Sequence, residues 1–371
     1  MPVEIKPIQL PADANAFINV WFDLYGSNPN WVAPLKFERR DFLNPNKNPY
    51  FKLANIQCFI AWKDGKAVGT ISAQVDKGYQ SVEANVGFFG FFEFTDDEEV
   101  ARGLIEAARD WLRGQGMARM MGPFNFNTNH ECGLLVDAFD QDPLVLMTYN
   151  LPYYPAMYET LGLTKAKDLY AYWLENNGPV PERIGKLADR FMEKHPEITI
   201  RSFNLKKFES EVAIAKDIYN DAWADNWGFV KLTDEEFQKV AEGLRPMIDP
   251  RYCYVVERNG VPIAFSLTLP DYNQVVKPMK GSIFPFGWWH WLTMPKKINQ
   301  IRVFVLGVRR EFQYLAIGAP LYKRTWDNGR EAGVKGAECS WILEDNFRMR
   351  GALEKMGAKI YKTYRLYGGD L

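Results

Sequence analysis

Two segments of the chain are rich in the apolar and aromatic residues that favour β-strands, and an Asp-Gly or Asn-Gly pair interrupts each segment. The first runs from Cys58 to Gly69 around Asp64-Gly65, and the second runs from Cys253 to Ala264 around Asn259-Gly260. Strand-forming residues on both sides of such a pair predict two β-strands joined by a two-residue turn, because Asp-Gly and Asn-Gly readily adopt the positive φ that both turn positions need. The sequence therefore predicts the same hairpin twice, and the two copies align without gaps.

A second pair of segments has the same separation along the chain as the two hairpins. Tyr158 to Gly162 and Leu353 to Gly357 each end a short helix, and each is followed by an aromatic strand, at Leu169 to Leu174 and at Ile360 to Tyr367. Equal spacing of two independent signals indicates an internal repeat. We therefore expect an α/β (α+β) protein with two copies of one fold, each a mixed, mostly antiparallel sheet flanked by helices.

A polar turn cluster at residues 176–179 follows the last strand of the first copy, so the expected domains are 1–177 and 178–371. A helix at residues 181–195 would open the second copy. The expected elements between the repeated anchors differ in the two copies. The first has a strand at 85–94, a helix at 96–113, a strand at 118–121 and a polar loop at 122–139, and the second has an insertion at 271–299, a strand at 301–308 and a helix at 319–332.

The most informative stretch joins the strand at 301–308 to the helix at 319–332. It contains the small residues Ala316 and Gly318 directly before the helix. Backbone N–H groups at a helix N-terminus converge on an anion, and small side chains let a phosphate approach them. The pattern predicts a pyrophosphate-binding turn in the second copy. In the first copy, residues 95–100 place four acidic side chains at the equivalent position, and these would repel a pyrophosphate.

The second copy resembles the GNAT acyltransferase superfamily. Gln313-x-x-Ala316-x-Gly318 is similar to the turn that holds the pyrophosphate of acetyl-CoA or acyl-CoA in that family, and Asn346 matches the Asn before its next helix. Leu353 stands where the family usually has the tyrosine that protonates the CoA thiolate. The resemblance implies acetyl-CoA or acyl-CoA as co-substrate, held in the second copy by Leu306, Gly307, Val308, Gln313, Tyr314, Leu315, Ala316, Ile317, Gly318, Ala319 and Asn346.

Three runs in the first copy, at residues 122–136, 149–154 and 167–172, resemble a bacterial tandem-GNAT group related to bacterial ceramide synthases. The tandem arrangement is also similar to that of Fem-type aminoacyl transferases and N-myristoyltransferases. The resemblance implies an N-acyltransferase that moves an acetyl or longer acyl group from CoA to an amine, either a small molecule or a long-chain lipid amine. A non-catalytic acyl-CoA-binding protein is the alternative, and Leu353 motivates it.

The candidate catalytic residues lie outside the strand at 301–308, because that strand carries no acid. Acyl transfer needs a group that removes a proton from the amine and donors that polarise the thioester carbonyl. His130 and Glu131, an ionisable pair in an asparagine-bearing loop, are the first candidates for the proton acceptor, although loop asparagines also form turns. Further candidates are Glu338, Glu344 and Asp345 as acids, and Tyr314 and Tyr364 as replacements for the missing tyrosine.

Residues 281–297, here called the aromatic segment, are unusually rich in rings for an insertion. They include Phe284, Phe286, Trp288, Trp289 and Trp291, followed by Lys296-Lys297. Such a segment would either cover the cleft as an apolar wall or enter a membrane interface, where tryptophan is favourable and lysine meets anionic headgroups. Both interpretations predict an apolar ligand nearby.

Charge and cysteine usage exclude several other classes. The 45 Lys and Arg residues nearly balance the 46 Asp and Glu residues, so the chain lacks the basic field that nucleic-acid binding needs. A transfer-RNA-dependent reaction is disfavoured for the same reason. Four scattered cysteines and three separated histidines argue against a disulfide framework and against a metal site. We expect a cytoplasmic protein, with possible peripheral contact at the inner face of the membrane through residues 281–297 and with an oligomeric state that the sequence leaves open.

Overall fold

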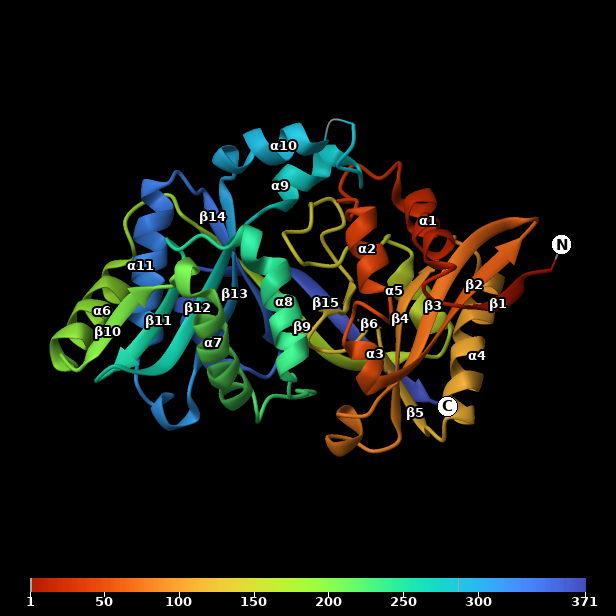
Figure 1. Ribbon diagram of the computed structural model, residues 1–371, viewed down its shortest axis with the longest axis horizontal. Coiled ribbons are helices and arrows are strands. Elements are labelled where there is room, and N and C mark those ends of the chain that lie inside the picture. Colours follow the sequence, from red (N-terminus) through yellow and green to blue (C-terminus); the bar gives the residue numbers. More distant parts are fainter. Residues whose placement is uncertain (1, 286) are drawn as a thin grey trace.

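The computed structural model describes residues 2–285 and 287–371, which form two lobes joined by one large sheet (Figure 1). The strands are β1 Glu4–Ile8, β2 Ala54–Lys63, β3 Lys66–Asp76, β4 Val86–Phe94, β5 Arg119–Gly122, β6 Phe124–Asn125, β7 Glu131–Cys132, β8 Leu134–Leu135, β9 Thr164–Glu175, β10 Ile198–Ser202, β11 Cys253–Arg258, β12 Val261–Pro270, β13 Gln300–Val308, β14 Gly336–Leu343 and β15 Lys359–Asp370. The helices are α1 Ala14–Tyr25, α2 Lys36–Phe42, α3 Tyr50–Leu53, α4 Glu98–Gly114, α5 Tyr154–Thr160, α6 Glu182–Lys194, α7 Phe208–Ala222, α8 Asp234–Leu244, α9 Asn273–Val276, α10 Gly287–Thr293, α11 Gly318–Glu331 and α12 Phe347–Lys355.

Both repeated hairpins form as predicted. β2 and β3 pair antiparallel around Asp64 and Gly65, whose φ angles are 52° and 74°, and β11 and β12 pair around Asn259 and Gly260, with φ of 50° and 80°. Positive φ at two successive positions is the turn geometry that matches the twist of the flanking strands. The α/β fold class and the mostly antiparallel sheet flanked by helices are confirmed.

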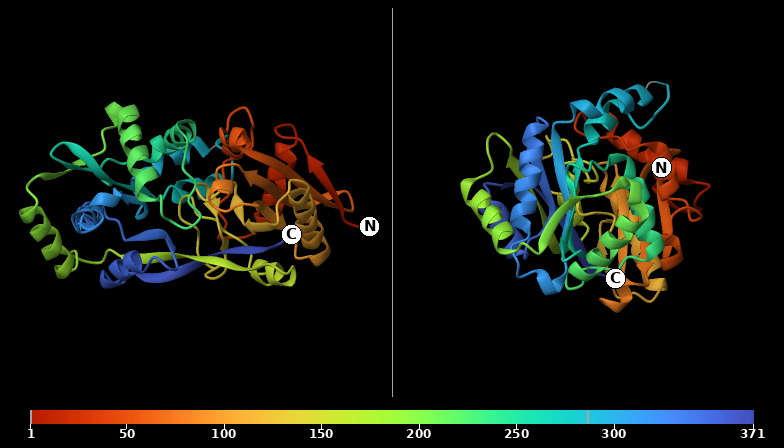
Figure 2. Two further views of the ribbon diagram at one scale, coloured as in Figure 1. Left: turned by 90° about the horizontal axis from the view of Figure 1, so that it is seen from below. Right: turned by 60° about the vertical axis from the view of Figure 1, so that its left-hand side comes forward.

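The two lobes exchange their last strands. The sheet order is β1-β2-β3-β4-β5-β15-β9-β14-β13-β12-β11-β10, so the C-terminal β15 lies between β5 and β9, and β9 lies between β15 and β14. Both termini consequently lie in the first lobe, as the further views show (Figure 2). The division at residues 177 and 178 stays a prediction, and in the structure the last strand of each segment pairs with a strand of the other.

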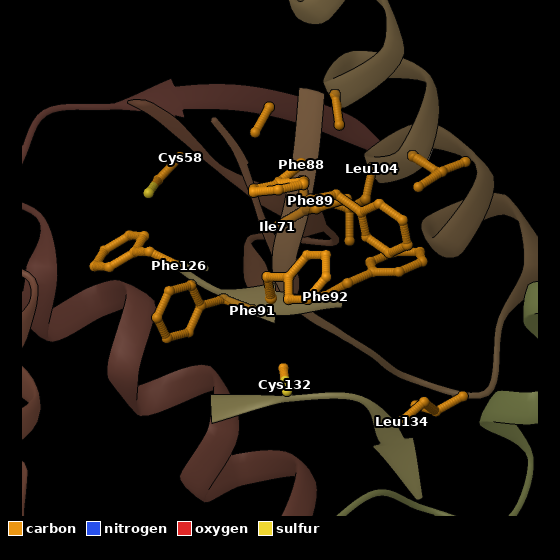
Figure 3. Packing of buried hydrophobic residues seen from close by; sticks show 14 of the residues in the cluster. Cys58, Ile71, Phe88, Phe89, Phe91, Phe92, Leu104, Phe126, Cys132 and Leu134 are labelled. Atoms are coloured by element: carbon orange, nitrogen blue, oxygen red, sulfur yellow. The ribbon is translucent and has the colours of Figure 1, made fainter. Parts of the chain in front are cut away.

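Two helices cover opposite faces of the sheet in the first lobe. Leu104 of α4 packs where a side chain on Gly69 would lie, whereas the indole N–H of Trp21, on α1, donates to the hydroxyl of the next residue, Thr70, at 3.1 Å. Neighbouring residues of a strand point to opposite faces, so α1 and α4 enclose β3. Figure 3 shows the aromatic core between them, where Phe91 and Phe126 lie with ring centroids 5.2 Å apart.

The polar loop expected at residues 122–139 contains three short strands. β6 and β7 pair with Phe124 opposite Cys132, and β8 joins the edge of β15. The hairpin lies against β4 because Gly90 has no side chain there, and a Cβ on Gly90 would come within 1.7 Å of the Phe124 carbonyl oxygen. Asn125 fixes the contact, since its side-chain oxygen accepts from the Phe91 N–H at 2.7 Å. Gly90 therefore sets the position of the loop that carries His130 and Glu131.

We predict that Gly90→Ala lowers the free energy of unfolding by at least about 2 kcal/mol, because the new methyl group would displace the β6–β7 hairpin. Gly114→Ala is the matched control, since nothing lies within 4 Å of a Cβ at that end of α4. The control is expected to stabilise by up to about 1 kcal/mol. Urea unfolding of the three proteins measures both effects, and equal midpoints for wild type and Gly90→Ala would contradict the close approach.

Candidate functional site

A single large cavity, with a volume of about 2050 Å³, connects the two lobes. One end reaches the turn before α11, where Gln313, Ala316 and Gly318 line it, and the other end lies among aromatic side chains of the first lobe. The predicted loop residues His130 and Glu131, which belong to the first lobe, line the same cavity. The structure thus brings the two main groups of predicted site residues to one space.

The edge of β13 faces this cavity because its parallel pairing with β14 stops early. The two strands pair only from Gln300 with Gly336 to Val303 with Cys339, and β13 then continues to Val308 beside β12 alone. On the opposite edge of β13, the Arg309 N–H donates to the Ile263 carbonyl of β12 at 2.9 Å. Because N–H groups alternate along a strand, those of Val308 and Leu306 point to the open edge.

The turn before α11 has the small-residue geometry that the sequence predicts. Among the described residues, the backbone N–H groups of Ala316, Ile317 and Gly318 have no backbone acceptor. Gly318 lies against the ring of Tyr322, which a Cβ would approach to 3.2 Å. N–H groups without acceptors at the start of a 14-residue helix form a site suited to an anion.

The predicted cofactor residues divide into two groups. Leu306, Val308, Gln313, Leu315, Ala316, Gly318, Ala319 and Asn346 line the cavity. Gly307, Tyr314 and Ile317 are not among the lining residues: Gly307 packs against the Trp223 ring, the Tyr314 side chain is 74% exposed, and Ile317 belongs to the core. Asn346 caps α12 by accepting from the Met349 N–H at 3.1 Å.

In the first lobe, a carboxylate of the protein itself caps the N-terminus of the equivalent helix, α4. Asp97 caps α4 by accepting from the Glu99 N–H at 3.0 Å, and its carboxylate pairs with Lys63 at 2.6 Å. These contacts lower the pKa of Asp97. A carboxylate therefore occupies the position at α4 that a phosphate would take at α11.

Glu131 is held as a carboxylate by an arginine that the sequence analysis did not identify. Arg39 on α2 donates to one oxygen of Glu131, and the Asn125 amide donates to the other at 3.2 Å. Burial alone would raise the pKa of Glu131, but the charge and the hydrogen bond of Arg39, together with Asn125, hold it below its ordinary value. This pairing makes Glu131 a weak proton acceptor and an anchor for the loop.

His130 has a defined orientation and stays neutral. Its Nδ1 lies 2.9 Å from the Asn127 side-chain oxygen, while the Asn127 amide donates to Asp76 at 2.9 Å. The chain of contacts assigns the proton to Nδ1, which leaves Nε2 with a lone pair. Burial lowers the pKa of His130 to about 4, against the opposing charges of Glu131 and Asp76. His130 can therefore accept a proton at neutral pH, although with a small driving force.

Glu338 is a buried partner of Arg302 and is not among the residues that line the cavity. The two residues lie opposite each other on β14 and β13, with Arg302 Nε and Glu338 Oε1 3.6 Å apart. Ser340 donates to the same oxygen at 2.6 Å, and Tyr361 donates to the other. Its oxygens are thus engaged by protein groups, and the geometry favours a structural role over proton transfer.

The remaining acids and phenols that we proposed lie in different places. Asp345 lines the cavity and pairs with Lys167 at 2.7 Å, whereas Glu344 pairs with Lys165 at 2.6 Å outside the set of lining residues. Tyr314 and Tyr364 are not lining residues either. Leu353 packs in the core beside α11, and the phenol that lines the cavity there is Tyr322, whose hydroxyl contacts the Met349 sulfur at 3.2 Å.

The insertion at 271–299 lies over the space between the lobes. Figure 1 shows α9 and α10 at the top, between the lobe of β14 and the lobe of α1. The Lys36 N–H of the first lobe donates to the Gly281 carbonyl at 3.0 Å, and Leu35 packs against Val275. Side chains of α10 that line the cavity are those of Trp288, Trp291 and Leu292. Phe286 lies outside the described residues.

Sequence reasoning missed the aromatic end of the cavity in the first lobe. Trp21, Tyr25, Trp31, Phe91, Phe92 and Glu93 line it. The signal was present, because Glu93 is the one charged residue of the apolar strand β4.

Within residues 2–285 and 287–371, no cluster of three or more His, Cys, Asp or Glu side chains is arranged to hold a metal ion. In the same residues, no helix combines the length and the apolar composition needed to cross a bilayer.

Known proteins resemble this chain over its whole length. No family model matches the sequence. A protein named bacterial ceramide synthase, from Caulobacter vibrioides, is 36% identical over 373 residues, which cover 98% of this chain and 97% of that protein. Protein YghO of Escherichia coli is 36% identical over 363 residues, or 96% of this chain and 92% of that protein.

Solved structures show the same fold at low sequence identity. A tandem GNAT protein from the clavulanic acid biosynthesis pathway superposes with a TM-score of 0.58 at 12% identity, covering 99% of this chain and 98% of that one. A GCN5-related N-acetyltransferase from Sphaerobacter thermophilus gives 0.53 at 12% identity, covering 99% and 95%. The tandem GNAT architecture is therefore confirmed.

The state of His130 predicts a pH dependence of stability. Its folded pKa of about 4 lies below the ordinary value of 6.5, so the unfolded chain binds the extra proton as pH falls from 6.5 to 4. Stability from this residue is therefore present above pH 6.5 and is lost below it. Because the ring keeps access to the cavity, we expect a loss of about 1 to 2 kcal/mol between pH 7.5 and 5.0 that is absent in His130→Gln. Urea unfolding at both pH values measures it, and parallel losses in the two proteins would show that His130 titrates normally.

Proposed function

The chain belongs to the acyltransferase family that contains the Caulobacter bacterial ceramide synthase and E. coli YghO, and we propose that it transfers an acyl group from acyl-CoA to a long-chain amine. Ceramide is an N-acylated long-chain amine, so the name of the first relative is consistent with this acceptor class. The fold supports the same reaction type, since its neighbours include GNAT N-acetyltransferases.

The single observation that carries the proposal is the continuous cavity of about 2050 Å³. Sites for drug-sized ligands have volumes of up to about 1,000 Å³, so this cavity has room for more than one such ligand. The turn before α11 would hold the CoA pyrophosphate, and the aromatic end in the first lobe would hold an apolar chain. Both substrates could then occupy one continuous space, in which their reacting groups can be held together.

Each chemical need of the transfer has a candidate in the cavity. The N–H groups of Val308 and Leu306, at the open edge of β13, would polarise the thioester carbonyl. His130, neutral and with Nε2 available, is our candidate for the proton acceptor, and Glu131 would hold the loop through Arg39. Tyr322 is our candidate for the group that stabilises the departing thiolate, although burial raises the pKa of its hydroxyl above the ordinary range.

A transfer assay separates this proposal from a catalytically silent acyl-CoA-binding protein. Acyl-CoA of chain lengths C2, C8 and C16 would be incubated with small polar amines and with long-chain amines. CoA release would be followed with a thiol reagent, and the amide product by mass spectrometry. Amide formation with a long-chain amine supports the transferase, whereas CoA binding without turnover on any amine supports the silent binding protein.

We propose that the aromatic segment also contacts the membrane surface at the inner face of the cytoplasmic membrane. Phe284 and Trp289, which do not line the cavity, are 78% and 57% exposed. The exposed Lys280, Lys296 and Lys297 lie close to them in sequence, and residues 272–310 contain no acid. Exposed rings beside lysines favour an anionic lipid surface. A lipid amine would reach the cavity from this side.

Gly318→Glu is predicted to abolish CoA binding, because it places bulk and negative charge at the N–H groups that would hold the pyrophosphate. Gly114→Glu is the control, since it adds the same side chain at a helix end of the first lobe without a neighbour within 4 Å. Isothermal titration with CoA is the measurement. Equal affinity of wild type and Gly318→Glu for CoA would show that the pyrophosphate does not bind at this turn.

Two adjacent tryptophans on α10 allow the cavity wall and the membrane contact to be tested separately. Trp288 lines the cavity, whereas Trp289 does not and is 57% exposed. Trp288→Ser is predicted to reduce the preference for C16 over C8 acyl-CoA or amine about tenfold, because burial of an apolar ring face contributes about 25 cal/mol per Å². Trp289→Ser should leave that preference intact and reduce flotation with anionic vesicles. Chain-length-independent turnover in the wild type would exclude the lipid substrate.

A further inference from the structure

Glu93 is a carboxylate without a cationic partner at the aromatic end of the cavity. It lies near the end of β4, among the rings of Trp21, Phe91 and Phe92 that line the same space. Among the described residues it forms no salt bridge, and the nearby Arg39 is paired with Glu131. A buried carboxylate usually has a cationic or strong hydrogen-bonding partner, so an incomplete set of partners indicates a place for a ligand.

Two phenols hold one oxygen of Glu93 and leave the other free. The hydroxyls of Tyr25, on α1, and Tyr154, on α5, both donate to Oε2, the latter at 2.9 Å. Oε1 accepts no hydrogen bond from the described residues and remains accessible from the cavity. The phenols fix the direction of the carboxylate, so Oε1 has a set position in the cavity wall.

The pKa of Glu93 is consistent with the lack of a cationic partner among the described residues. Burial raises the pKa of Glu93 to about 7, while the hydrogen bonds from Tyr25 and Tyr154 lower it and the charge of Glu131 adds to the rise. A cationic ligand would offset the cost of burying this charge. An alkylammonium supplies both the charge and three donors, and the surrounding rings present faces that attract cations. A neutral hydroxyl could donate to Oε1 but would leave the charge uncompensated.

We propose that Glu93 binds the ammonium group of the acceptor amine and thereby selects a long-chain amine over the alcohol of the same length. This inference rests on the proposed function, because it assigns the position of the acceptor in the same cavity. The ammonium would be captured at Glu93, and the nitrogen would give a proton to His130 before it attacks the thioester at the open edge of β13. Glu93 is thus the specificity-determining residue of the first lobe.

Binding can be measured without acyl-CoA, using dodecylamine and 1-dodecanol as probes below their aggregation limits and tryptophan fluorescence as the signal. Dodecylamine stays protonated between pH 6 and 8, as a lysine side chain does. For a pKa of about 7, the ionised fraction of Glu93 is about tenfold higher at pH 8 than at pH 6. We therefore expect the wild type to bind dodecylamine up to about tenfold more tightly at pH 8, and dodecanol equally at both pH values.

Glu93→Gln should lose both the preference for the amine and its pH dependence, while dodecanol binding and CoA binding remain. Glu98→Gln is the control, since it makes the same change on the exposed face of α4. The pH effect is taken as the difference between wild type and Glu93→Gln, because burial also raises the pKa of Glu38 in the cavity. The other groups nearby do not titrate between pH 6 and 8. The pKa values of Tyr25, Tyr153 and Tyr154 are raised above their ordinary value, so these phenols stay neutral. The pKa values of His130 and Glu131 are lowered, and Arg39 stays charged.

A second variant protects the test against misfolding of Glu93→Gln. Tyr154→Phe removes a donor that lowers the pKa of Glu93, so the pH midpoint of dodecylamine binding should move upward. An unchanged midpoint, or an unchanged amine preference in Glu93→Gln, would overturn the inference. Failure of the proposed function is a separate result. If the wild type binds dodecylamine in this way but acylates no amine, the ammonium site at Glu93 stands and the acyltransferase proposal fails.

Discussion

The early end of the parallel pairing between β13 and β14 is the constraint on which the site depends. The pairing stops at Val303 and Cys339, one residue beyond the buried pair of Arg302 and Glu338. Arg302 also donates to the Val145 carbonyl at 2.8 Å, which ties this point to the segment between β8 and α5. Removing one partner of such a buried pair would leave an uncompensated charge, so the point of divergence is firmly held. Beyond it, the free edge of β13 forms one wall of the cavity.

Glu131, Glu93 and Glu338 differ in the partners that surround their carboxylates. Glu131 is paired with Arg39 and stays ionised, Glu93 is held by phenols alone and titrates near neutral pH, and the carboxylate of Glu338 is enclosed by protein donors. His130 is kept neutral by burial. Similar residue types thus have different properties because the number and charge of their neighbours differ. A sequence pattern contains the residue types but not these neighbours.

Local signals in the sequence predicted the local structure well. The hairpins around Asp64-Gly65 and Asn259-Gly260 and the strand-turn-helix around Gly318 follow from turn chemistry and periodicity, which act over a few residues. The exchange of β9 and β15 could not be predicted, because both strands have similar aromatic patterns and neither pattern specifies a partner. Arg39 and Glu131 are 92 residues apart, so their pairing was also inaccessible. Glu93 could have been noticed, as a lone acid in a strand of aromatic residues.

The exchanged strands make the two copies of the repeat inseparable. Each segment contains the strand that completes the sheet of the other, since β15 pairs with β5 and β9 pairs with β14. A chain cut between residues 177 and 178 would give two fragments, each with an edge that only the other can cover. Such fragments would be expected to complement one another rather than to act as independent modules. The duplicated chain therefore folds as one unit, because deletion of either copy would leave the other without a strand of its sheet.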